Sequence, residues 1–69
     1  MDNILGSYLA RFKASLQIDS NVKESVVQEL YTHLKDKSQE LKGKGFSEEE
    51  ADKFAVKALG SPELVARQI

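Results

Sequence analysis

The stretch G-F-S-E-E-E-A-D-K-F-A-V-K-A-L-G-S-P-E-L-V-A, residues 45–66, decides the fold because it contains two helix starts with one helix end between them. Ser47 stands three residues before Glu50, which is the capping-box spacing. In a capping box the serine hydroxyl accepts the Glu50 amide proton, and the Glu50 carboxylate reaches back to the serine amide. Phe46, just outside the cap, is placed to fold against Ala51. The stretch therefore predicts a helix that begins at Ser47.

The same stretch predicts where this helix ends and how the next one begins. Gly60 supplies a residue for the left-handed conformation that is common at helix ends. Ser61 is a capping residue, and Pro62 fits the first turn of a helix, where its missing amide proton costs nothing. The sequence therefore predicts a sharp corner between two helices. Residues 62–69 are too few to hold a helix alone in water, so we expect this segment either to dock on the others or to continue into chain beyond Ile69.

The predicted helix before the corner has a face of small residues, Ala51, Ala55 and Ala58, around two large ones, Phe54 and Leu59. A face of small residues permits a close approach to a neighbouring helix. We expect Phe54 to fill that interface, so that its replacement by alanine would cost about 3–5 kcal/mol.

A long helix is predicted over residues 21–42, with Asp19 or Ser20 as its cap. Its apolar positions spread over about 180° of the helix circumference, wider than the stripe of about 100° that one neighbour needs. These positions are Val22, Val26, Val27, Leu30, Tyr31, Leu34 and Leu41. The helix should therefore contact two neighbours, the first helix on one side and the following helix on the other. Gly43 and Gly45 are both free to adopt positive φ at its end.

The first helix is predicted from one apolar stripe with spacings of three and four residues. The members of this stripe are Ile4, Leu5, Tyr8, Leu9, Phe12 and Leu16. Asp2 or Asn3 can cap this helix, and the pattern lapses at residues 17–19, where a short connection fits. The sequence thus predicts an all-α fold: a small bundle of three main helices, with a long central helix and a short C-terminal one, in a single domain over residues 1–69.

Composition narrows the class of protein. The 69 residues include 10 Lys and Arg against 11 Asp and Glu, a formal charge of -1, whereas nucleic-acid-binding domains usually carry a basic excess. The absence of cysteine fits a reducing compartment, so we expect a cytoplasmic protein. No apolar run is long enough to span a bilayer, and no signal peptide is recognisable. Because the sequence stops at Ile69 within an apolar pattern, we expect an N-terminal fragment of a longer protein.

One histidine is the only candidate for site chemistry. His33 shares a side of the long helix with Glu29, Asp36 and Glu40, and such a stripe could in principle hold a metal ion. The more common interpretation places His33 at the edge of the core, with a ring nitrogen bonded to Glu29 or to backbone. No second histidine, nucleophile-elbow motif or glycine-rich phosphate loop is present. We therefore expect no catalytic residue, no metal, no other cofactor and no enzyme.

Two sets of residues could meet a partner. A cluster of lysines at one end of the long helix is either solvated charge or a contact for an anionic membrane surface or nucleic acid; it comprises Lys35, Lys37, Lys42 and Lys44. Other residues are the ones least explained by the core, and we predict them as a surface for a protein partner or for self-association, although single exposed apolar residues are also ordinary. They are Val27, Tyr31, His33 and Val56.

Three motifs carry a family resemblance. The segments E-L-Y-T-H-L-K-D (residues 29–36), G-F-S-E-E-E-A (45–51) and A-L-G-S-P-E-L-V-A (58–66) resemble the small helical HAAS-type, or permease-prefix, domains of bacteria. The resemblance implies an adaptor that mediates protein contacts at the cytoplasmic N-terminus of a larger protein, ahead of transmembrane helices, in permease-like or signalling proteins. It implies no catalytic residue. The matching positions have architectural roles in that family: Glu29, His33, Gly45, Ala51, Gly60 and Pro62.

Two hypotheses of function follow. The first is a non-enzymatic protein-interaction or signalling-accessory module, in the cytoplasm or at the inner face of a membrane. The second is a small nucleic-acid-binding or transcription-regulator domain, because three helices with a tight corner can also present a recognition helix. A weaker likeness links Gly45-Phe46 and Ala58-Leu59 to ubiquitin-associated domains, but the spacing between the two pairs differs from theirs. The charge balance favours the first hypothesis.

Overall fold

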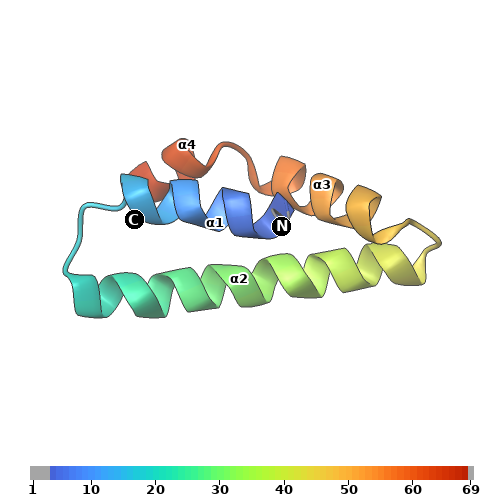
Figure 1. Cartoon of the computed structure of the whole chain (residues 1–69), viewed down its shortest axis with the longest axis horizontal. Helices are drawn as coiled ribbons and strands as arrows, with labels where there is room; N and C mark the ends of the chain where they lie inside the picture. Colours follow the sequence, from blue (N-terminus) through green and yellow to red (C-terminus); the bar gives the residue numbers. More distant parts are fainter. Residues whose placement is uncertain (1–3, 69) are drawn as a thin grey trace.

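Residues 4–68, which the computed structural model describes, form four helices and no strand (Figure 1). The helices are α1 (Ile4–Ser15), α2 (Ser20–Gly43), α3 (Glu48–Leu59) and α4 (Pro62–Arg67). The predicted all-α bundle, with its long central helix and short C-terminal helix, is confirmed. The predicted caps at Asp2 and Asn3, and the predicted docking of Ile69, lie outside the described residues.

Helix α2 begins and ends at signals that are local in the sequence. Asp19 is its cap, because the Asp19 carboxylate accepts a hydrogen bond from the Asn21 amide at 3.0 Å. At the other end the Gly45 amide donates to the Lys42 carbonyl, and the amide of the next residue donates to the Leu41 carbonyl. This pair of bonds, with Gly45 at φ 105°, is the Schellman arrangement of a helix end.

Helix α3 begins at the predicted capping box. The Ser47 hydroxyl accepts from the Glu50 amide at 3.2 Å, and the Glu50 carboxylate accepts from the Ser47 amide at 3.2 Å. Phe46 lies between the end of α2 and the Ser47 cap. Its ring packs edge-on against the ring of Phe54, with 5.2 Å between the ring centroids. The ring of Phe46 thus meets a partner seven residues beyond the cap, where we expected Ala51 to be its contact.

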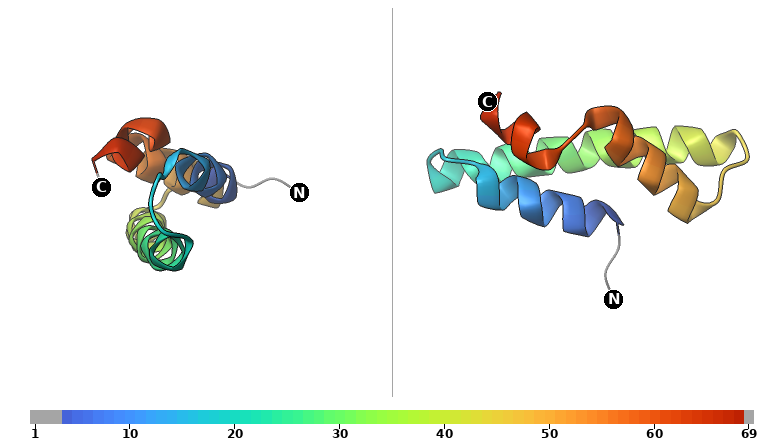
Figure 2. Two further views of the ribbon diagram at one scale, coloured as in Figure 1. Left: turned by 90° about the vertical axis from the view of Figure 1, so that its left-hand side faces the viewer. Right: turned by 90° about the horizontal axis from the view of Figure 1, so that it is seen from above.

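Helices α1 and α3 both pack along α2, and α4 packs against α1 (Figure 1). Seen end-on, α1 and α4 lie side by side above α2 (Figure 2). One buried cluster joins α1, α2 and α3 and contains Leu5, Tyr8, Leu34 and Ala55. A second cluster joins α1 to α4 and contains Phe12, Leu16 and Ala66. Leu30 of α2 packs against both clusters. Because α2 contacts both α1 and α3, the prediction that it has these two neighbours is confirmed.

The corner between α3 and α4 turns at Gly60, whose φ of 101° and ψ of -169° lie in an extended region that only glycine adopts readily. The predicted positive φ is therefore confirmed, but the residue is not in the left-handed helical region. Ser61 occupies the cap position of α4 without bonding the backbone there, since its hydroxyl donates to the Glu63 carboxylate at 3.0 Å. Pro62 begins the helix as predicted and is buried.

The prediction that Phe54 fills the α2–α3 interface is wrong. Its side chain is 44% exposed, and the buried face of α3 consists of Ala51 and Ala55. Phe54 directly precedes Ala55, and one residue turns the helix by about 100°, so the ring points away from this buried face. Phe54 lies instead at the margin of α3, where it contacts Phe46. Val22, expected to be in the core, is also exposed at 53%.

Substitution of Gly60 tests the corner. We expect Gly60→Ala to lower the free energy of unfolding by about 1–3 kcal/mol, because a Cβ makes this φ and ψ costly. The cost is purely conformational, since a Cβ built on Gly60 meets nothing within 4 Å. Urea denaturation measures it. Gly43→Ala, a matched change in helical backbone with equally open surroundings, should cause no loss, and a stability of Gly60→Ala equal to that of Gly43→Ala would refute the argument.

Two phenylalanine substitutions test the revised view of the core. Phe12 has no exposed surface, so Phe12→Ala should cost about 3–5 kcal/mol of unfolding free energy. Phe54→Ala should cost only about 1–2 kcal/mol, from its partial burial and its contact with Phe46. Thermal and chemical denaturation of the two variants provide the comparison. Equal losses would show that Phe54 is a core residue after all.

Candidate interaction surface

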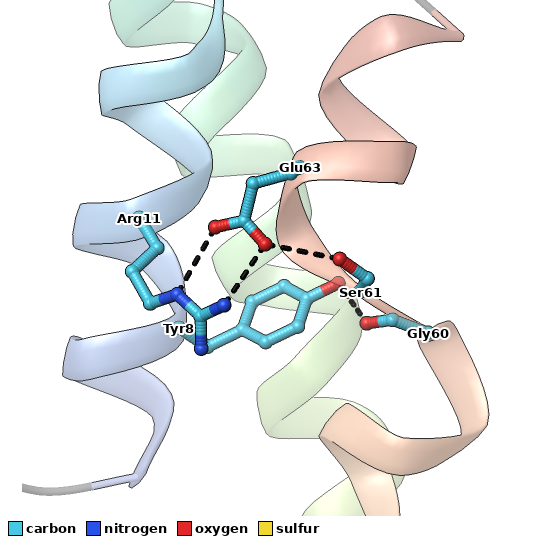
Figure 3. Close-up of polar contacts among 5 residues, drawn as sticks. All are labelled: Tyr8, Arg11, Gly60, Ser61 and Glu63. Atoms are coloured by element: carbon cyan, nitrogen blue, oxygen red, sulfur yellow. Dashed lines mark hydrogen bonds and ion pairs between the residues drawn. The ribbon is translucent and has the colours of Figure 1, made fainter.

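A set of polar contacts fixes the α3–α4 corner onto α1 (Figure 3). The buried Tyr8 of α1 donates its hydroxyl proton to the Gly60 carbonyl at 2.8 Å. Three residues further along α1, the Arg11 guanidinium donates two hydrogen bonds to the Glu63 carboxylate, at 3.0 and 2.9 Å. Ser61 donates to the same carboxylate. Of these corner contacts, those made by Tyr8 and Arg11 join parts of the chain that are 52 residues apart, and together with the cluster of Phe12, Leu16 and Ala66 they hold α4 on α1.

The corner contacts also shift the pKa values of Tyr8 and Glu63. Burial raises the pKa of the Tyr8 hydroxyl, and the negative charge of Glu63 raises it further, against a smaller lowering by Arg11. The hydrogen bond from Arg11 lowers the pKa of the Glu63 carboxyl, with a further contribution from Ser61 that partial desolvation opposes. Tyr8 therefore stays a neutral donor at physiological pH, and Glu63 stays a charged acceptor.

A buried polar pair joins α2 to α3. Ser38 is buried, and its hydroxyl donates to the Asp52 carboxylate at 2.5 Å. Nothing in the sequence analysis singled out either residue. Ser38 falls on the same side of α2 as Leu34, one turn earlier, and this spacing is the one signal that could have predicted its burial. The pair therefore holds α3 against α2, and Ser38 is not part of the exposed surface.

A shallow groove runs along α2 between that helix and the α3–α4 pair. Its first part, a hollow of about 170 Å³, lies between α2 and α4 and is lined by Val26, Glu29, Leu30, His33 and Val65 above Phe12. Its second part, about 160 Å³, lies between α2 and α3 and is lined by His33, Leu34, Lys37, Ala55, Ala58 and Leu59. His33 belongs to both parts, so they form one surface, which we call the α2 groove. Each part is smaller than the roughly 300–1,000 Å³ of a typical small-molecule site.

His33 is exposed, and its ring has no hydrogen-bond partner among residues 4–68. The predicted bond to Glu29 or to backbone is therefore absent from this region, although the ring does lie beside Val26 and Leu30 in the α2 groove. Within the same described residues, no group of three or more histidine, aspartate or glutamate side chains is arranged to hold a metal ion. His33 is therefore a candidate binding residue because it lies midway along the mainly apolar α2 groove.

The residues predicted as a partner surface do not form one surface. Tyr31 is 41% exposed, and it lies two residues from His33, a turn of about 200° that places the two side chains on opposite sides of α2. Val27 is half-buried against the cluster of Phe12, and Val56 is half-buried against the cluster of Tyr8. Of the four, His33 lies in the α2 groove and Tyr31 is a separate exposed residue. Val27 and Val56 belong to the margin of the core.

Three of the four clustered lysines have carboxylate partners. Lys37 and Lys44 both lie 3.7 Å from Glu40, and Lys42 lies 3.6 Å from Glu48. Exposed ion pairs of this kind contribute little stability, but they offset the positive charge of the cluster. This end of α2 therefore has a mixed charge and is not a continuous basic patch.

Compared with protein-family models, with curated proteins and with solved structures, the chain gives no match. Among the described residues, 4–68, none of the helices has both the length and the apolar character needed to cross a bilayer.

The Arg11–Glu63 pair makes a prediction about pH. The folded state lowers the pKa of Glu63 below its ordinary 4.5, so the pair stabilises the fold above that pH and loses this contribution as the pH falls further. Glu63→Gln should therefore have a lower Tm than the parent chain at pH 7, and the difference should shrink as the pH falls below 4.5. Thermal melts across pH measure this. Asp36→Asn, which removes a carboxylate without an ion pair in the described residues, is the control; an Asp36→Asn pH profile that matches that of Glu63→Gln would contradict the assignment.

Proposed function

We propose that this domain is a non-enzymatic protein-interaction module. The observation that carries the proposal is the amount of apolar side chain left uncovered by so small a bundle. Within residues 4–68, six large apolar side chains keep between 37% and 55% of their surface exposed: Val22, Tyr31, Phe46, Phe54, Leu59 and Leu64. Aromatic and aliphatic anchors of this kind contribute most of the energy at protein interfaces.

The polar groups of the fold support a module without chemistry of its own. The Tyr8 hydroxyl, the Arg11–Glu63 pair and the Ser38 hydroxyl each bond to another helix or to the corner. Each of these contacts holds two parts of the bundle in place, which is a structural role. A catalytic site needs a nucleophile or an acid–base pair within reach of a substrate cavity, and these polar groups serve packing instead.

The resemblance to HAAS-type domains supports a more specific role. The three motifs of that resemblance form the middle of α2, the capping-box start of α3, and the corner with α4, and each of them directs how the bundle packs. We propose on this basis a signalling-accessory role in bacteria, with the domain on the cytoplasmic side of a membrane-associated protein. The mixed charge around Lys37, Lys42 and Lys44 is a weaker basis for a nucleic-acid partner.

Site-specific photo-crosslinking in the cells that produce the protein tests the proposal. A photoreactive phenylalanine analogue is placed in turn at Tyr31, Phe54, Leu59 and Leu64, which are exposed positions on three helices. We expect at least one position to give a discrete protein adduct. The same analogue at Ala14, an exposed position on α1, should give none, because none of the exposed large apolar side chains belongs to this helix.

Two results would contradict the proposed function. One is the absence of an adduct from all four positions in cells that contain the folded domain. The other is micromolar, salt-sensitive DNA binding in gel-shift assays at low and moderate salt, which would favour the nucleic-acid hypothesis.

A further inference from the structure

We infer that the α2 groove receives an amphipathic helix of about three turns, presented by a partner protein and carrying basic residues along one edge. This inference rests on the proposed function and specifies where and how a partner binds. The lining from Val26 to Lys37 covers eleven residue steps of α2, roughly 16 Å, which matches three helical turns. Helix-in-groove binding uses apolar anchors at this scale, spaced three and four residues apart.

The groove is open because of how the corner places α4. A straight continuation of α3 would have run further along α2, but the chain turns at Gly60 and the corner contacts draw α4 onto α1. Leu30 and Val65 are thereby left half-buried on either side of the hollow, and Leu59 stays 37% exposed at the end of α3. A helix lying in the groove would cover these three side chains with its own apolar face.

Negative charge along the outer edge of the groove favours an occupant with basic residues. Glu29 lines the groove, and Asp36 lies seven residues further along the same side of α2. Neither carboxylate has an ion pair among residues 4–68, whereas the charge of Lys37 is partly offset by Glu40, which Lys37 shares with Lys44. Two basic residues about two turns apart on the occupant would meet both carboxylates, and His33 between them could bond to a polar side chain of the occupant.

The other occupants fit less well. In the described part of the chain, each helix exposes at most two large apolar side chains, so a second copy has no exposed apolar stripe three turns long to insert. An anionic bilayer would be repelled by the Glu29–Asp36 edge, and a flat surface cannot follow a groove between helices. The occupant is therefore a partner helix.

A peptide titration of the whole chain tests the inference. The probe is a synthetic helical peptide with leucines spaced three and four residues apart and arginines seven residues apart along one edge. We expect saturable amide shifts in ¹H–¹⁵N NMR spectra at Leu30, His33 and Leu59, with a Kd tighter than about 1 mM. A matched peptide with glutamate in place of each arginine should bind about tenfold more weakly.

Variants distinguish the groove from the rest of the surface. Ala58→Arg places a long side chain on an exposed wall of the groove and should weaken binding of the arginine peptide about tenfold, whereas Ala14→Arg, on the exposed side of α1, should not. Glu29→Arg should reverse the preference, so that the glutamate peptide binds the variant more tightly than the arginine peptide does. This reversal is a gain of binding, which misfolding cannot produce.

Three results would overturn the inference: no shifts at millimolar peptide, shifts that map to Tyr31 or Phe54, or groove shifts that appear with protein concentration alone, which would make the occupant a second copy. Each of these would leave the proposed function standing if the cellular crosslinks form at other positions. Loss of all crosslinks would contradict the proposed function itself.

Discussion

The burial of Tyr8 is the interaction on which the rest of the bundle depends. Its ring packs with Leu34 of α2 and Ala55 of α3, and its hydroxyl bonds to the carbonyl at the α3–α4 corner. One side chain of α1 therefore contacts α2, α3 and the corner that leads into α4. Because a buried hydroxyl without a partner is costly, the ring can be buried here only if Gly60 presents its carbonyl at this place. The position of the corner and the packing of α1 are thus mutually dependent.

The helix boundaries of this protein could be predicted from its sequence because the bonds that define them are local. The Asp19 carboxylate accepts from an amide two residues ahead, and Ser47 and Glu50 bond to each other across three residues. At the end of α2, the Gly45 amide bonds to a carbonyl three residues earlier, and the amide of the next residue bonds to a carbonyl five residues before it. For such bonds the residue types and their spacing contain all the required information. The corner at Gly60 was predicted for the same reason.

The contacts between helices were predicted less well, because they depend on which faces meet and at what distance. Apolar periodicity placed Phe54 in the core, yet the buried face of α3 is centred on Ala51 and Ala55, and Phe54 lies at its margin. Polar contacts between helices were not predicted. Arg11 is an exposed residue of α1 and still binds Glu63, and the burial of Ser38 could be anticipated from its spacing to Leu34, but its partner Asp52 could not. The α2 groove was missed as well, since it results from the departure of α4 towards α1.

The pairing of α1 with α4 has a consequence for the way the chain acquires its structure during synthesis. Phe12 and Leu16 emerge from the ribosome well before Ala66, which completes their cluster from α4. Until then these side chains have only part of their native surroundings, and the chain carries exposed apolar surface of the kind that chaperones bind. The native packing of α1 must therefore wait until α4 has been translated.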